Sequence, residues 1–135
     1  MPGNPLDIAL TFDDGFWAPA YATMRSVSLA SHRRADLVFH LFHRDLTAEH
    51  RAALDAIPRE FGATLIDYDL TTNAAFTGFL AGMSYHKALT NLVYARLMLD
   101  QMLPPEIRRV LYLDCDMLVR APVEDLFALD LKGKA

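Results

Sequence analysis

Four short apolar runs alternate with longer segments of helical character, and this alternation constrains the fold more than any other feature of the chain. The runs contain aliphatic, β-branched and aromatic side chains and predict strands at residues 8–12, 37–42, 63–68 and 110–113. The intervening segments predict helices at residues 21–31, 47–57 and 86–103. Strands that alternate with helices indicate an α/β domain with a mostly parallel sheet covered on both faces.

The size and charge of the chain narrow the class of protein further. A chain of 135 residues can bury one core, so we predict a single domain over residues 1–135. The hydrophobic fraction of 53% and the charged fraction of 22% are typical of a compact globular protein. A net charge of -4 without a basic run argues against a nucleic-acid partner, because phosphate backbones are bound by clustered Lys and Arg.

Neither the amino terminus nor the cysteine content indicates secretion. Residues 1–5 lack a basic flank followed by an apolar signal-peptide core, and the single Cys115 excludes an intrachain disulfide framework. No apolar run reaches the roughly 20 residues that span a bilayer. We therefore predict no transmembrane segment and expect a cytoplasmic location.

Three segments carry predictions that depend on weaker patterns. Thr47 is predicted to cap the second helix, which Pro58 should disturb near its end. Residues 70–85 contain two glycines and no clear period, which predicts a long loop with at most one short helical turn. The helix at residues 86–103 is apolar on most of its circumference, so we expect it to be largely buried, with Arg96 on its apolar face.

The chain contains two Asp-x-Asp triplets, each after an apolar run. Asp114 and Asp116 follow the fourth strand, whereas Asp67 and Asp69 belong to the end of the third. Chance alone would produce roughly one such triplet at this Asp content, so the bare pattern has little specificity. The second triplet therefore serves as an internal control for the first.

The expected strand order separates the two triplets. If strands one to three are arranged 3-2-1 and the fourth lies on the other side of the first, the switch point falls between strands one and four, where ligands bind. Asp13, at the end of strand one, and Asp114 would then face the same crevice. Asp67 and Asp69 would lie at the far edge of the sheet.

Two neighbouring carboxylates at a strand end repel each other unless a cation lies between them. A hard divalent cation, Mn²⁺ or Mg²⁺, removes the repulsion between Asp114 and Asp116 and bridges them to the oxygens of a diphosphate. Arg96 would pair with a carboxylate or a phosphate at the floor of the cleft. The competing interpretation of the acidic pair is a solvated turn.

Several polar residues have a structural interpretation that competes with a functional one. For Asp14 the capping of a helix or turn is nearly as good an interpretation as function, so Asp13 is the preferred candidate. Cys115 is interpreted as a small filler whose backbone matters more than its sulfur. His40 and His43 show no ligand spacing and are expected at a sheet edge or on the surface.

Three further functions are compatible with parts of the pattern. A phosphohydrolase of the haloacid dehalogenase type also uses Asp-x-Asp after a strand, but normally at the start of its domain. A phospho-receiver domain fits the Asp13-Asp14 pair and an Asp after strand three, but needs two more strands. A non-catalytic nucleotide-binding or assembly module is the third alternative.

Three motifs resemble those of the family 8 glycosyltransferases, the group of the bacterial lipooligosaccharide galactosyltransferases and glycogenin. The motifs are Thr11-Phe-Asp-Asp14, Tyr94-Ala-Arg-Leu97 and Val110-Leu-Tyr-Leu-Asp-Cys-Asp-Met-Leu-Val119. The resemblance implies a Rossmann-like GT-A fold and a UDP-sugar donor. It also implies a Mn²⁺ (or Mg²⁺) ion held by Asp114 and Asp116. The implied reaction transfers a hexose, with retention of configuration, to a glycan or a lipid-linked sugar acceptor.

The same resemblance implies roles for individual residues. Thr11 and Asp13 would contact the uridine, Phe16 would stack on the uracil, and Arg96 would reach the donor sugar or the diphosphate. The backbone of Cys115 would lie against the ribose. The residues implied to bind the nucleotide sugar are Thr11, Phe12, Asp13, Phe16, Arg96, Asp114 and Cys115. Gly15 stands where family members often have Asn or another polar residue, so one nucleotide contact that the resemblance implies lacks its usual side chain here.

Members of this family continue for well over a hundred further residues, with a downstream His that completes the metal shell and residues that bind the acceptor. The resemblance therefore implies a truncated GT-A fold that represents the nucleotide-sugar-binding part. We expect this chain alone to bind UDP or a UDP-sugar weakly with Mn²⁺ and to turn over poorly or not at all. Exposed apolar surface on such a part predicts a homo-oligomer.

Overall fold

The computed structural model describes residues 3–82 and 92–134 and contains a four-stranded parallel sheet with the order β3-β2-β1-β4. The strands are β1 (Leu6–Asp13), β2 (Leu37–Arg44), β3 (Thr64–Asp69) and β4 (Leu111–Tyr112). The long central pair begins with Leu6 opposite Leu37, and β4 joins β1 through Ile8 opposite Leu111. The predicted strand order and parallel sheet are confirmed.

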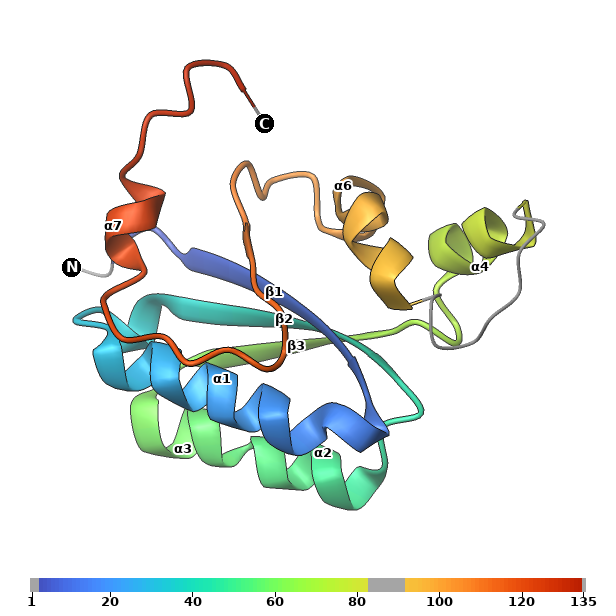
Figure 1. Ribbon diagram of the computed structural model, residues 1–135, viewed down its shortest axis with the longest axis horizontal. Helices are drawn as coiled ribbons and strands as arrows, with labels where there is room; N and C mark the ends of the chain where they lie inside the picture. Colours follow the sequence, from blue (N-terminus) through green and yellow to red (C-terminus); the bar gives the residue numbers. More distant parts are fainter. Residues whose placement is uncertain (1–2, 83–91, 135) are drawn as a thin grey trace.

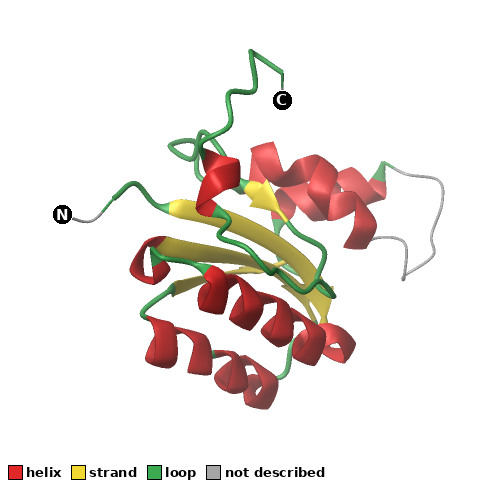
Figure 2. Cartoon of the chain, turned by 60° about the vertical axis from the view of Figure 1, so that its left-hand side comes forward, coloured by secondary structure: helices red, strands yellow, loops and turns green. Residues whose placement is uncertain are grey.

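Helices cover both faces of the sheet (Figure 1). One layer consists of α1 (Trp17–Ala30), α2 (Ala48–Leu54) and α3 (Ala56–Phe61). The other contains α4 (Ala74–Ala81), η3 (Leu92–Met98) and α6 (Leu99–Met102). Short turns η1 (Asp14–Phe16), η2 (Arg34–Asp36) and α7 (Glu124–Phe127) complete the described elements. Figure 2 shows the strands between these two groups of helices.

The alternation of side chains along the strands divides the core into two clusters. Ile8 and Leu10 of β1 and Phe39 of β2 face α1 and α3, whereas Ala9 and Phe42 face α4, η3 and α6. Each face thus buries its own apolar layer, as expected for a parallel sheet. Across the described ranges, no helix has the length and apolar character to cross a bilayer.

The first layer of helices differs from prediction mainly at its boundaries. α1 begins at Trp17, four residues before the predicted start, and its first turn accommodates Pro19. Thr47 caps α2 as predicted, because its side chain accepts a hydrogen bond from the His50 N–H at 3.2 Å. The break lies between α2 and α3, at Asp55. It precedes Pro58 because a proline lacks the N–H that would bond four residues back.

The prediction of a long loop at residues 70–85 is wrong, because α4 occupies eight of these positions. Asn73 caps this helix by accepting the Phe76 N–H at its side-chain oxygen, 3.0 Å away. Phe76 is buried in the cluster that α4 shares with η3 and α6. The two glycines obscured a helix whose capping residue and buried aromatic were both present in the sequence.

The segment predicted as the longest helix is not a continuous, buried α-helix in its described part. Residues 86–91 lie outside the described residues, residues 92–98 form a 3₁₀ helix, and only the last turn is α-helical. Ala95 and Met98 are buried at a spacing of three, as the 3₁₀ period requires, whereas Leu97 is 63% exposed. The change of period turns Arg96 away from the apolar face and into an exposed position.

His40 lies in the interior, which contradicts its predicted place at an edge or on the surface. It belongs to the internal strand β2 and is 1% exposed. Its Nε2 lies 2.8 Å from Asp7 Oδ1, and its Nδ1 lies 2.8 Å from the Tyr68 hydroxyl. Burial, with a smaller effect of the Asp7 carboxylate, raises the pKa of Tyr68, so the phenol stays protonated beside His40. Because both ring nitrogens of His40 have hydrogen-bond partners, its burial leaves no polar atom of the ring unsatisfied.

Candidate functional site

A cavity of about 320 Å³ opens at the carboxyl ends of β1 and β4. It is lined by Thr11, Phe12, Asp13, Phe16, Leu92, Arg96, Tyr112, Asp114, Cys115 and Asp116. Every residue that the sequence singled out for the site lines this one cavity. Leu92 and Tyr112 were missed. Tyr112 had a signal, because it precedes Asp114 by two residues and period-two alternation places both on one side of the chain.

A larger cavity of about 780 Å³ lies at the opposite, amino-terminal end of the strands. Its lining includes Leu6, Val38 and Phe127, but none of the predicted site residues. Ligands of open parallel sheets bind beyond the carboxyl ends of the strands, at a topological switch point. The smaller cavity occupies that position, so its place in the fold and its chemistry both favour it over the larger one.

The floor of the cavity joins the ends of two adjacent strands. Thr11 Oγ1 and the Tyr112 hydroxyl lie 2.8 Å apart and form a hydrogen bond between β1 and β4. Asp13 follows Thr11 by two residues and lies on the same face of β1. Its Oδ1 is shielded from solvent and accepts no hydrogen bond from residues 3–82 or 92–134. A buried, unpaired acceptor is costly, so Asp13 offers a strong position for a ligand donor.

The two carboxylates of the first triplet lie beyond β4, where the chain leaves the sheet. A turn at residues 115–116 separates Asp114 from Asp116, and both side chains are exposed where they line the cavity. Burial raises the pKa of the Cys115 thiol, and the carboxylates of Asp116, Asp114 and Asp13 add to the shift. The thiol therefore stays protonated at neutral pH, which makes it a poor nucleophile.

The donor set of the cavity fits a divalent cation that is shared with a ligand. Within the described part of the chain, no three His, Cys, Asp or Glu side chains come together as a metal site. Asp114 and Asp116 supply carboxylate oxygens only, the ligand type that Mg²⁺ and Mn²⁺ prefer. Because Mg²⁺ is commonly held by one or two carboxylates together with substrate phosphates, the pair fits the protein's part of such a site.

Arg96 lines the same cavity from η3, although it does not lie on a buried face as predicted. It forms no ion pair or hydrogen bond with any other residue that the structure describes. The guanidinium is therefore free to bind an anion that enters between β1 and β4. Its planar set of N–H donors matches phosphate oxygens.

Asp14 caps a neighbouring helix, as the structural interpretation predicts. Its Oδ1 accepts the Thr47 N–H at 2.9 Å and lies 2.7 Å from His50 Nδ1. The imidazole of His50 in turn stacks on Trp17, with ring centroids 4.5 Å apart. These contacts connect the turn after β1 to the start of α2. The hydrogen bond from Thr47, followed by that from His50, holds the pKa of Asp14 below its ordinary value.

This lowered pKa predicts a pH-dependent contribution of Asp14 to stability. A carboxyl whose folded-state pKa lies below its unfolded value stabilises the fold fully above the ordinary pKa of 3.8, and the effect disappears as the pH falls through the lower value. Asp14→Ala should therefore lower the midpoint of urea unfolding at pH 7, and the deficit should shrink below pH 3.8. Glu49→Ala, an exposed carboxylate in the first turn of the same helix, is the matched control.

An equal deficit for Asp14→Ala at pH 7 and at pH 3 would contradict the capping role of the ionised carboxylate.

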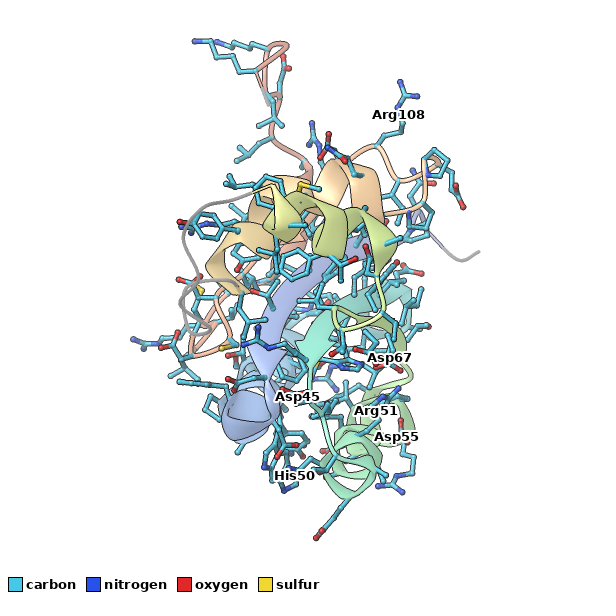
Figure 3. All side chains as sticks on the ribbon, turned by 90° about the vertical axis from the view of Figure 1, so that its right-hand side faces the viewer. Asp45, His50, Arg51, Asp55, Asp67 and Arg108 are labelled. Carbon is cyan, nitrogen blue, oxygen red and sulfur yellow. The ribbon has the colours of Figure 1, made fainter. Side chains whose placement is uncertain are left out.

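The second triplet is occupied by structural contacts on the edge strand β3. Asp67 forms hydrogen bonds of 2.8 and 2.9 Å with Arg51 Nε, and Arg51 also binds Asp55 (Figure 3). Asp69 Oδ1 accepts the Thr71 N–H at 2.9 Å. Neither carboxylate of this pair lines the candidate cavity. The two Asp-x-Asp triplets therefore differ in their surroundings, and only the triplet beyond β4 lines the candidate cavity.

Comparison with known proteins identifies the family to which a chain with this site belongs. The family model described as "Glycosyl transferase family 8" matches residues 7–135. The chain belongs to glycosyltransferase family 8. No curated protein matches it significantly.

Solved structures agree with this family 8 assignment. The active-site mutant Q189E of LgtC is 29% identical, with a TM-score of 0.70, and the match covers 93% of this chain and 43% of that one. The galactosyltransferase LgtC in complex with donor and acceptor sugar analogs is 30% identical, with a TM-score of 0.68 and the same coverage. The apo form of GlyE from Streptococcus pneumoniae TIGR4 is 25% identical, with a TM-score of 0.63, and the match covers 93% of this chain and 27% of that one.

The fold is thus that of the GT-A glycosyltransferases, and this family 8 chain spans less than half the length of LgtC. The phospho-receiver alternative is wrong on topology, because a flavodoxin-like receiver places strand one between strands two and three. Here β2 lies between β1 and β3. Family membership over residues 7–135 also replaces the phosphohydrolase alternative.

Proposed function

We propose that this chain binds a UDP-sugar in the cavity between β1 and β4, as the donor-binding part of a retaining glycosyltransferase. The observation that carries the proposal is the convergence of three complementary groups on one cavity. These are the acidic pair beyond β4 and two groups that have no partner among residues 3–82 and 92–134, the buried acceptor of Asp13 and the guanidinium of Arg96. A nucleoside diphosphate has a base with a hydrogen-bond donor and a negatively charged diphosphate. The acceptor of Asp13 suits the base, whereas Arg96 and a cation held by the acidic pair suit the diphosphate.

The nucleoside end of the donor is assigned to β1 and the turn after it. The imide N–H of uracil can donate to Asp13 Oδ1 and relieve its unpaired burial. Phe16 is 47% exposed at the cavity and offers a ring face for stacking on the base. Thr11 is held by Tyr112 and lines the same floor. These three positions are the ones that the family resemblance assigns to uridine.

The diphosphate end is assigned to the opposite wall. Asp114 and Asp116 would hold Mn²⁺ or Mg²⁺, and such a cation supplies charge stabilisation for the departing diphosphate. Arg96 adds a second positive group, which can stabilise the same leaving group from η3. The backbone of Cys115, between the two carboxylates, is assigned to the ribose, as the family resemblance implies. This wall therefore stabilises the diphosphate as its bond to the sugar breaks.

The crystal structure of LgtC with donor and acceptor sugar analogs supports a sugar donor and a sugar acceptor for this chain. That protein is named as a galactosyltransferase, which favours a hexose as the transferred group. We propose a glycan or a lipid-linked sugar as the acceptor. The second candidate function is non-catalytic UDP-sugar binding, which is favoured because the cavity provides contacts for the leaving group and none assigned to an acceptor.

Calorimetry with UDP tests the proposal directly. Titration in MnCl₂ should show saturable binding that weakens strongly when EDTA replaces the metal, and ADP should bind less tightly than UDP. Absence of UDP binding under both conditions would refute donor binding. Release of UDP from UDP-galactose in the presence of a panel of free sugars and glycans as acceptors then separates the two candidates, because the non-catalytic candidate predicts binding without release.

Arg96→Ala is expected to weaken binding of UDP with Mn²⁺ about tenfold, the loss that corresponds to one charge-assisted hydrogen bond. Arg108→Ala is the matched control, because Arg108 (labelled in Figure 3) is also exposed but lines the larger cavity instead of the candidate site. Calorimetry on both variants gives the two dissociation constants. Equal constants for the two variants would remove Arg96 from the site.

A further inference from the structure

Helix α1 contacts the backbone that follows the acidic pair through a buried hydroxyl. Thr23 is fully buried, and its Oγ1 accepts the Met117 N–H and donates to the Met117 carbonyl, both at 3.0 Å. One side chain thus binds both polar groups of a single residue. Met117 directly follows Asp116. The hydroxyl of Thr23 therefore restrains the backbone immediately after this carboxylate.

The contact is repeated further along the same helix. Ser26 Oγ accepts the Val119 N–H at 2.9 Å and donates to the Thr23 carbonyl at 2.7 Å. Ser31 Oγ donates to Glu124 at 2.6 Å, where α7 begins. Figure 1 shows the segment after β4 running along α1 toward α7. The hydroxyl groups of α1 and of Ser31, the residue that follows it, thus hold this segment at successive points along its length.

The direction of the Asp116 side chain depends on these contacts because regular structure ends before it. β4 stops at Tyr112, and residues 113–122 belong to no helix or strand. A strand ladder therefore does not orient Asp116. The side chain is exposed, so neighbouring packing restrains it little. The Met117 backbone, held by Thr23, is the nearest anchored point.

We propose that Thr23 is a positioning residue that orients Asp116 toward a divalent cation in the cavity. The proposal rests on the proposed function, because it assigns the cation to Asp114 and Asp116. The hydroxyl of Thr23 holds the backbone at Met117 in the conformation in which both carboxylates line the cavity. Ser26 supports the same segment two residues later. Outer-shell groups of this kind commonly determine how well a carboxylate binds a metal.

A comparison within α1 separates this role from ordinary helix stability. Ser28 is also fully buried, but its Oγ donates at 2.8 Å to the Met24 carbonyl of its own helix. It has no hydrogen bond to the segment after β4. Ser28→Ala therefore removes a buried hydroxyl from the same helix without releasing the acidic pair, and it is the matched control for Thr23→Val.

The test measures Mn²⁺ binding to the full chain saturated with UDP, by the loss of the free Mn²⁺ signal in electron paramagnetic resonance. Thr23→Val, which keeps the shape of the side chain and removes its hydroxyl, should weaken Mn²⁺ binding about tenfold or more. Thr23→Ser, which restores the hydroxyl, and Ser28→Ala should bind Mn²⁺ like the unaltered chain. Affinity for UDP in EDTA should be the same in all variants, because the assigned uracil contacts come from β1 and the following turn.

Ser26→Ala provides a second variant that releases Val119 and should weaken Mn²⁺ binding by a smaller factor, even if Thr23→Val fails to fold. Unchanged Mn²⁺ affinity in the folded Thr23→Val or Ser26→Ala variants would overturn the positioning role and leave the proposed function intact. Failure of the unaltered chain to bind Mn²⁺ together with UDP would overturn both. Equal losses in Thr23→Val and Ser28→Ala would assign the effect to helix stability and reject the positioning role.

Discussion

Asp116→Asn is expected to abolish the metal-dependent part of UDP binding, with a loss of about 100-fold in affinity in the presence of Mn²⁺. Asp114→Asn should have the same effect. An amide keeps the size of the side chain but lacks the negative charge that makes a carboxylate a ligand of hard divalent cations. Binding of UDP in EDTA should change little in either variant. Calorimetry with and without MnCl₂ measures both quantities.

Asp69→Asn is the control for these substitutions, because it changes the triplet with the same spacing at the end of β3. Its side-chain oxygen accepts the Thr71 N–H, a role that an amide oxygen also fulfils. This variant should bind UDP and Mn²⁺ normally. If Asp116→Asn and Asp69→Asn bind Mn²⁺ with equal affinity, the acidic pair beyond β4 is not the cation site.

His40→Leu is expected to lower the free energy of unfolding by about 2–4 kcal/mol, a large fraction of the stability of a domain of this size. The substitution removes two hydrogen bonds from the centre of the sheet. It leaves the Tyr68 hydroxyl and the Asp7 carboxylate without their partner, while the added apolar surface offsets only part of that cost. Urea unfolding followed by circular dichroism measures the change.

The control for this substitution is His32→Leu, because His32 is exposed and follows α1 outside the sheet. Exposed positions of this kind usually change stability by no more than about 0.5 kcal/mol. A loss in His40→Leu as small as that in His32→Leu would mean that the hydrogen bonds of His40 contribute nothing net to stability.

The strands and their order could be predicted because the signals that define them are local. Runs such as residues 8–12 and 37–42 are apolar and bounded by turn residues, and the handedness of parallel connections leaves few arrangements. Thr47 was recognised as a cap for the same reason, because capping depends on a few adjacent residues. These elements needed no knowledge of distant contacts.

Two of the predictions that failed, the place of His40 and the face of Arg96, depend on features that only the folded chain shows. The sequence shows His40 as a polar residue in a strand, and only the fold brings Asp7 and Tyr68 to its two nitrogens. The 3₁₀ geometry of residues 92–98 shifts every side chain relative to an α-helical wheel, which explains the misplaced face of Arg96. Neither effect leaves a periodic signal in the residues concerned.

Site residues that lie at or just beyond strand ends could be predicted from the sequence. A residue that positions another side chain could not. Asp13 and Asp114 follow from the strand order alone, since both end strands that adjoin the switch point. Thr23 lies 94 residues from its hydrogen-bond partner, in a helix where Ser and Thr indicate only lower helix propensity. A contact of that sequence separation requires the folded chain.

The register between β1 and β4 determines where length changes can occur in this chain. Ile8 pairs with Leu111 and Ala9 with Tyr112, so the two walls of the cavity are aligned by only two paired positions. An insertion or deletion of one residue between Leu111 and Asp114 would shift the acidic pair relative to β1 and change the side of the chain that Asp114 faces. The connections on either side of β2 can vary in length without this effect. Natural relatives and engineered variants should therefore differ in length within those connections and keep the short step from β4 to the acidic pair constant.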